Sequence, residues 1–229
     1  MKLDAALADL KSAAIPGKAG EMAAYHKVDR TYLGVSNPEI DAKCKGWRQE
    51  INLDARLTLA SELWNTNIHE ARVAASKLLT QARIRPDDSA AWELIKSWVP
   101  DFDAWAIADH AAIAGQKRLV WVPERINDLA GWTTSDHLWT KRAVLVMTLP
   151  WCKQTHPKPA DLEIRERILE WAALYVEDPE WFIQKAVAWW LRDLSKRDPE
   201  SVQKFLDTYG SAMKPFAQRE ASKYLVEKN

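Results

Sequence analysis

The chain has 229 residues, enough for one substantial domain or two small ones, and its 47% hydrophobic and 28% charged residues are typical of a globular protein. The longest apolar stretch, Ala143 to Cys152, is about half of the roughly 20 residues that a membrane-spanning helix needs, so we expect no membrane association. The chain has 32 basic and 32 acidic residues, so a nucleic-acid partner would need a local concentration of positive charge. We expect no signal peptide, and the unpaired cysteines Cys44 and Cys152 favour the cytoplasm.

Helical signals begin at the N-terminus, where Leu3, Leu7 and Leu10 form one apolar stripe. Asn37-Pro38-Glu39 then predicts a helix start, with asparagine as the N-cap and proline in the first turn. The same signals recur as stripes at 164, 168, 171 and at 202, 206, 209, and as starts at Asp178-Pro179-Glu180 and Asp198-Pro199-Glu200. Without a hairpin turn or sustained two-residue alternation, the sequence predicts an all-α protein with about 12 or 13 helices.

An aromatic residue followed three positions later by a basic residue recurs along the chain. The pairs are Trp139/Arg142, Phe182/Lys185 and Phe216/Arg219, and His69/Arg72 is a looser copy. Phe102/Trp105 lies between the copies at 72 and 142, with tryptophan in place of the basic residue. The second members are 33, 37, 43 and 34 residues apart, which matches one helical hairpin per repeat. We therefore predict a HEAT-like helical-repeat solenoid, formed by a single domain over residues 1–229.

Stacking of these repeats would bring equivalent positions onto one surface. Arg72, Arg142, Lys185 and Arg219 would then form a basic stripe, which we expect on a concave DNA-binding face. The alternative is a ladder of solvated charges or ion pairs between helices, and the sequence leaves both possibilities open.

Four residues are candidates for chemistry. Trp105 and Asp109 are four apart and share a helix face, and we expect them to converge on a groove with Arg142 and Trp189. A fixed carboxylate can stabilise the cationic sugar that forms when an N-glycosidic bond breaks. Tryptophan rings attract cations by roughly 0.5–2 kcal/mol, and an arginine fork can hold a phosphate. The alternative for Asp109 is an ordinary carboxylate on a helix surface.

The segments around these residues resemble the AlkD-type DNA alkylation repair family, which are HEAT-like-repeat DNA glycosylases. The resemblance covers nearly the whole chain and rests on Tyr32 to Pro38, Ile95 to Asp109, Trp132 to Ala143, Phe182 to Arg192 and Gln218 to Ala221. It implies that Asp109 is the catalytic carboxylate and that Trp105 and Trp189 form an aromatic cleft against the lesion's deoxyribose. Arg142 would hold a backbone phosphate.

The resemblance also implies an activity. The chain would be a monofunctional glycosylase that hydrolyses the N-glycosidic bond of cationic purines such as 3-methyladenine and 7-methylguanine. Its partner would be duplex DNA containing alkylated bases, reached in the bacterial nucleoid. We expect a monomer that uses no metal and no other cofactor.

The chain departs from the family pattern at three places. Ala188 replaces a frequent glycine, Trp190 adds bulk beside Trp189, and Val99-Pro100-Asp101 separates Trp98 from Trp105. An alignment with Trp98 in the cleft would leave no carboxylate one turn later, so we prefer the register of Trp105 with Asp109. A DNA-structure-binding protein without excision activity and a helical scaffold for a protein partner are the alternative functions.

Overall fold

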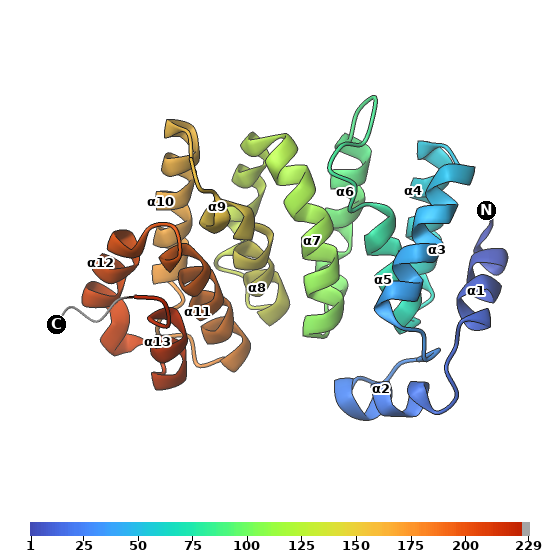
Figure 1. The fold of residues 1–229 in the computed structure, drawn as a ribbon, viewed down its shortest axis with the longest axis horizontal. Coiled ribbons are helices and arrows are strands. Elements are labelled where there is room, and N and C mark those ends of the chain that lie inside the picture. The colour runs from blue at the N-terminus through green and yellow to red at the C-terminus, as the bar shows by residue number, and fades with distance from the viewer. Residues whose placement is uncertain (226–229) are drawn as a thin grey trace. The chain divides into compact units, whose positions relative to one another are not determined.

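The computed structural model describes residues 1–225, which form 13 α-helices and three 3-10 helices (Figure 1). The one β-type pairing within these residues is an isolated bridge between Thr31 and Ile68, so the all-α prediction is confirmed. The chain divides into two compact units, Met1–Pro123 and Glu124 onward, and a single domain over residues 1–229 stays a prediction. No helix in the described part of the chain is both long and apolar enough to span a bilayer.

The first unit is built around one central helix, α5. Its elements are α1 (Leu3–Ser12), α2 (Lys18–His26), α3 (Asn37–Glu50), α4 (Leu53–Asn65), α5 (His69–Leu78), α6 (Ser89–Ser97), η1 (Val99–Asp101) and α7 (Trp105–Trp121). Helix α5 packs against α3, α4 and α7, and nearly all of its residues are buried. Alanines at 71, 74 and 75 let the neighbouring helices approach closely on several sides.

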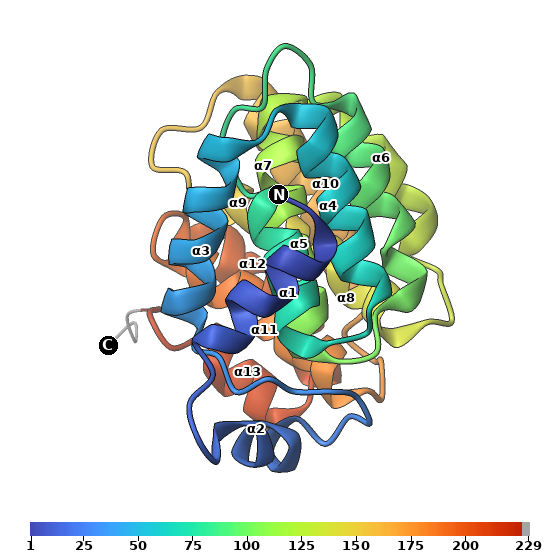
Figure 2. The same ribbon diagram turned by 90° about the vertical axis from the view of Figure 1, so that its right-hand side faces the viewer.

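Helix α2 lies apart from this layer, across one end of the first unit (Figures 1 and 2). None of its residues is fully buried, and the loop that follows it fixes its place. Gly34 in this loop has a φ of +81°, and a Cβ there would lie 2.8 Å from the backbone nitrogen of Ala19 in α2. Only glycine fits this backbone conformation and this close approach.

The second unit also has a central helix, α11. Its elements are η2 (Pro123–Trp132), which starts at the last residue of the first unit, and α8 (Leu138–Met147), α9 (Leu149–Lys153), α10 (Pro159–Ala173), α11 (Trp181–Ser195), α12 (Pro199–Tyr209), η3 (Gly210–Ala212) and α13 (Pro215–Ala221). Helix α11 packs against α8, α9, α12 and α13. Trp151, Trp190, Leu191 and Leu194 contribute to its core.

The helices begin at or within a few residues of the predicted starts. Asp198 caps α12 by accepting a hydrogen bond from the Ser201 amide (3.1 Å), as the sequence predicts. The cap of α3 is Ser36 instead of Asn37, because its hydroxyl accepts from the Glu39 amide. Asp178 forms a turn ahead of α11 by accepting from the Glu180 amide (2.9 Å), and the helix itself begins at Trp181.

Candidate active-site residues

The structure corrects the predicted register of the repeats around Trp105. Helix α7 begins at Trp105, so Phe102 lies before the helix, whereas Trp139, Phe182 and Phe216 lie inside theirs. Counted from the helix start, the fifth residues are Asp109 in α7, Arg142 in α8, Lys185 in α11 and Arg219 in α13. Asp109, and not Trp105, is therefore the counterpart of the basic residues.

Trp105 and Asp109 both come from the first two turns of α7. Ala104, in an extended conformation, precedes the helix and places Trp105 in its first turn. Both side chains are half-buried, and their four-residue spacing puts them on one face of the helix. The buried residues of α7 include Ala108, Ala111 and Ala112, which allow the helix to pack closely on α5.

The alternative alignment with Trp98 in the cleft is wrong. Trp98 is buried and stacks on Trp64, with ring centroids 4.5 Å apart and planes inclined by 7°. The Trp64 indole also donates to the carboxylate of Asp101 (3.0 Å), which belongs to the 3-10 helix η1. Trp98 is thus part of the core of the first unit, and the register of Trp105 with Asp109 keeps a half-exposed ring and an acid together.

Aromatic residues of α2 support Trp105. Tyr25 meets the Trp105 ring edge-to-face at 6.2 Å, and His26 lies 5.8 Å from it. His26 in turn stacks on His69 (4.5 Å), and Tyr32 stacks on both histidines. Sequence reasoning missed Tyr25 and His26 as neighbours of Trp105, because no spacing pattern connects α2 with α7.

Burial keeps three histidines near Trp105 and Asp109 neutral. The pKa of His69 is lowered to about 3, mainly by desolvation and to a smaller extent by the nearby His26 and Arg30. The pKa of His26 is lowered by burial and then by Arg30. Burial also lowers the pKa of His110, next to Asp109, to about 4. These rings therefore act as uncharged packing groups near neutral pH.

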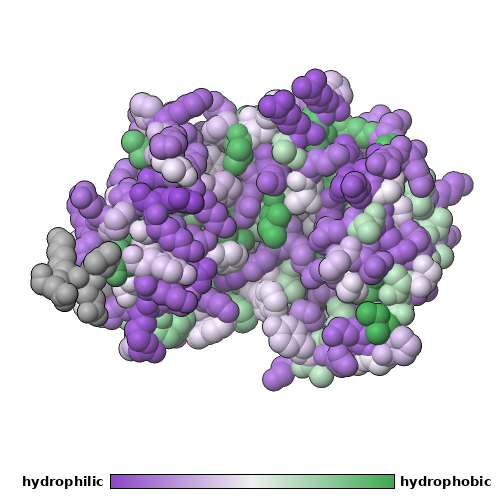
Figure 3. All heavy atoms as spheres, in the orientation of Figure 1, coloured by the Kyte–Doolittle hydropathy of each residue, from purple (hydrophilic) through white to green (hydrophobic). Residues whose placement is uncertain are grey.

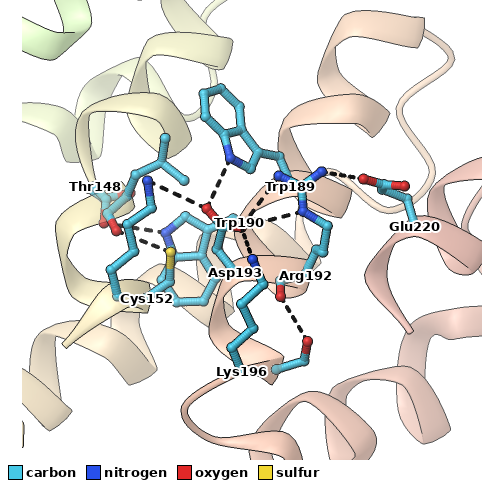
Figure 4. A network of polar contacts seen from close by, with 11 residues as sticks. Thr148, Cys152, Trp189, Trp190, Arg192, Asp193, Lys196 and Glu220 are labelled. Atoms are coloured by element: carbon cyan, nitrogen blue, oxygen red, sulfur yellow. Dashed lines mark hydrogen bonds and ion pairs between the residues drawn. The ribbon is translucent and has the colours of Figure 1, made fainter. Parts of the chain in front are cut away.

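In the second unit, Trp189 is held by a carboxylate on its own helix. Its indole donates to Asp193 (3.1 Å), one turn further along α11 (Figure 4). Lys153, Arg192 and Lys196 surround that carboxylate at 3.4, 3.3 and 3.6 Å. Arg192 also donates to Glu220 of α13. This network fixes the edge of a ring that remains half-buried and leaves part of its surface accessible.

The two departures beside Trp189 do not add bulk at its surface. Trp190 is fully buried, and its indole donates to the carbonyl of Thr148 (3.4 Å), as Figure 4 shows. Ala188 is also buried, at the floor of a groove between α11 and α13. The extra ring at position 190 therefore fills the core of the second unit.

Two of the four members of the predicted basic stripe, Arg72 and Arg142, are largely buried, and their binding to DNA stays a prediction. Arg72 is buried and donates to the carbonyls of Trp64 (3.1 Å) and Asp101 (3.4 Å). Arg142 is also buried; it donates to the Phe182 carbonyl (2.9 Å) and lies 5.8 Å from that ring. Both guanidinium groups link their own helix to the start of the following repeat.

Lys185 and Arg219 are exposed, as a DNA-binding surface requires, and their contact with DNA stays a prediction. Figure 3 shows one face of the molecule, on which hydrophilic residues prevail and apolar ones are scattered in small spots. Within residues 1–225, no group of three or more histidine, cysteine or acidic side chains is placed to hold a metal ion.

One family model matches nearly the whole chain, and solved structures share its fold. A family model described as "DNA alkylation repair enzyme" matches residues 6–225, whereas a comparison with curated proteins finds no match. A solved structure described as a predicted DNA alkylation repair enzyme from Enterococcus faecalis is 22% identical, with a TM-score of 0.79 over 93% of this chain and 97% of that chain. The structure of AlkD2 from Streptococcus mutans is 18% identical, with a TM-score of 0.63 over 83% of this chain and 90% of that chain. These structures share the fold of this chain.

Proposed function

Because the chain belongs to the DNA alkylation repair enzyme family, we propose that it is a DNA glycosylase that excises cationic alkylated purines, such as 3-methyladenine and 7-methylguanine, from duplex DNA. The observation that carries the proposal is the position of Asp109. It is an acid at the fifth residue of its helix, where α8, α11 and α13 have a basic residue, and Trp105 precedes it by one turn. A protein that only binds phosphates gains nothing from an acid at this position.

The chemistry follows from the charge of the lesion. In an alkylated purine that is already cationic, the C1′–N bond breaks as the base leaves with the bonding electrons and becomes neutral. The sugar becomes an oxocarbenium-like cation, which the Asp109 carboxylate stabilises. A water molecule adds to C1′ and Asp109 accepts its proton, so the products are the free base and an abasic site.

Aromatic side chains contribute a second form of stabilisation. We assign Trp105 and Trp189 to contacts with the deoxyribose, because the face of an indole ring attracts developing positive charge by roughly 0.5–2 kcal/mol. Tyr25 and His26 hold the first ring, and Asp193 holds the second. Lys185 and Arg219 are the exposed cations that we assign to backbone phosphates.

The test is release of 7-methylguanine from methylated duplex DNA. We expect Asp109→Asn to lower the single-turnover rate by about 100-fold or more, because the amide is nearly isosteric but carries no charge. Trp189→Ala should cost roughly 2- to 30-fold, which corresponds to the cation–π range. The control is Asp207→Asn, which changes an exposed acid on α12. Release that is unaffected by Asp109→Asn, or a folded wild-type protein that binds DNA without releasing any base, would refute the proposal.

A further inference from the structure

An exposed tryptophan lies on the same surface of α11 as Trp189 and Lys185. Of the 13 tryptophans, all within residues 1–225, Trp121 and Trp181 are the exposed ones, and each is 46% exposed. Trp181 is the first residue of α11 and lies at a groove of about 430 Å³ between α11 and α13. The walls of this groove include Trp181, Lys185, Trp189, Arg192, Phe216 and Glu220.

Aromatic and basic side chains alternate along one wall of the groove. Trp181, Lys185 and Trp189 follow each other at four-residue spacing and so share one face of α11. The ammonium group of Lys185 lies 4.6 Å from the centroid of the Trp181 ring. Lys185 is exposed, whereas the charge of Arg192 is balanced by Glu220 and Asp193. Lys185 is therefore the cation of this groove that is best placed to meet a phosphate.

The far wall of the groove provides a second ring. Phe216 of α13 stacks on Trp181, with centroids 5.7 Å apart and planes inclined by 27°. This contact holds the indole in place, although nearly half of its surface faces solvent. Aromatic rings interleaved with cations are the arrangement by which proteins bind unpaired nucleic acid, with bases stacked on the rings and phosphates on the cations.

We propose that this groove binds one unpaired nucleotide of DNA, with its base against Trp181 and Phe216 and its phosphate on Lys185. The inference rests on the proposed function, because it takes DNA as the partner and uses Lys185, which that function assigns to a backbone phosphate. A ring face selects for an unpaired base, because both faces of a base inside a duplex are covered by its neighbours. The volume of the groove falls within the roughly 300–1,000 Å³ that small-ligand sites occupy.

The test measures binding of the full chain to two short, labelled, undamaged duplexes that differ by one central bulged nucleotide. We expect the wild-type protein to bind the bulged duplex more tightly than the paired one. Trp181→Ala should remove this preference by weakening bulge binding roughly 5- to 100-fold, as expected for one stacked base, and should leave paired binding nearly unchanged. Lys185→Gln should lower the salt dependence of bulge binding by about one counterion.

Trp121→Ala is the matched control. That ring is equally exposed and also has a cation near it, since the Arg83 guanidinium lies 5.4 Å from its centroid. The variant should keep the full preference for the bulge. Trp181→Leu retains apolar packing against Phe216 without a flat ring, so it should lose the preference even if Trp181→Ala folds poorly.

Equal wild-type affinity for the two duplexes would overturn the inference. The inference would also fail if Trp181→Ala weakened the binding of both duplexes alike, or if neither duplex bound to the wild-type protein. Because the DNA is undamaged, loss of base excision does not affect this result. Conversely, absence of the preference leaves the release of 7-methylguanine as an independent test of the glycosylase proposal.

Discussion

A buried acid, Glu70, ties the loop after α2 to the core of the first unit. Its side chain is fully buried on α5 and accepts hydrogen bonds from the amides of Leu33 (2.9 Å), Gly34 (2.7 Å) and Val35 (3.2 Å). The same loop packs against α2 at Gly34, and α2 brings Tyr25 against Trp105. Removal of the carboxylate should therefore weaken the unit and loosen the support of Trp105.

The expected magnitude follows from these three bonds. A hydrogen bond to a charged group contributes about 1.5–3 kcal/mol, and part of that total offsets the cost of burying the carboxylate. Glu70→Ala leaves the three amides without their acceptor, so we expect a loss of about 3–5 kcal/mol in unfolding free energy. In Glu70→Gln, the amide oxygen can keep the bonds to Gly34 and Val35, while its NH2 group faces the Leu33 amide. That variant should lose about 1–3 kcal/mol.

Urea unfolding of the three proteins measures these losses, and amide hydrogen exchange locates them. Exchange at Leu33, Gly34 and Val35 should accelerate in Glu70→Ala far more than exchange along α11 of the second unit. Glu39→Gln, at an exposed acid in the first turn of α3, is the control and should change stability little. A loss below about 1 kcal/mol for Glu70→Ala, or equal losses for alanine and glutamine, would refute the reasoning.

Three further predictions address the same supports. The pKa of His69 is lowered from 6.5 to about 3, so between these pH values the unfolded chain binds a proton that the folded chain excludes. The free energy of unfolding should therefore fall by up to about 1.4 kcal/mol for each unit by which the pH is lowered from about 6.5 to 3. Thermal unfolding at several pH values should show a shallower decline for His69→Leu, but not for His156→Gln at an exposed loop. Gly34→Ala should lower the free energy of unfolding by at least about 2 kcal/mol, because Gly34 has a positive φ and the α2 backbone lies close to it. Gly46→Ala is the control: this glycine lies in a helix with open space around it, so urea unfolding should show a gain of about 0.5–1 kcal/mol. Asp193→Ala should cost about 1–3 kcal/mol and lower base release about as much as Trp189→Ala, because the indole loses its acceptor; release at the wild-type rate would contradict this role.

The local part of the fold could be predicted from the sequence. Apolar stripes and proline-marked starts depend on residues within one or two turns, so the helices from Leu3 and from Pro199 lie where the pattern predicts them. Trp105 and Asp109 could be paired for the same reason, since four-residue spacing alone places them on one face. The contacts of Tyr25 with Trp105 and of Phe216 with Trp181 join different helices, and no local pattern encodes them.

Burial of the basic residues shows what a repeat pattern leaves open. Arg142 and Lys185 are both the fifth residue of their helices, yet Arg142 is buried and Lys185 is exposed. In α8, Arg142 itself donates to the start of the next helix of the stack, at the carbonyl of Phe182. In α11, the neighbouring Gln184 makes this link: it is buried, donates to the carbonyls of Tyr175 and Val176, and accepts from the Lys214 amide ahead of α13. Because a neutral amide can satisfy these main-chain groups at position 184, the cation at 185 is released to the surface. Exposure of a base in such a repeat is thus decided by which neighbouring side chain binds the backbone of the following helix.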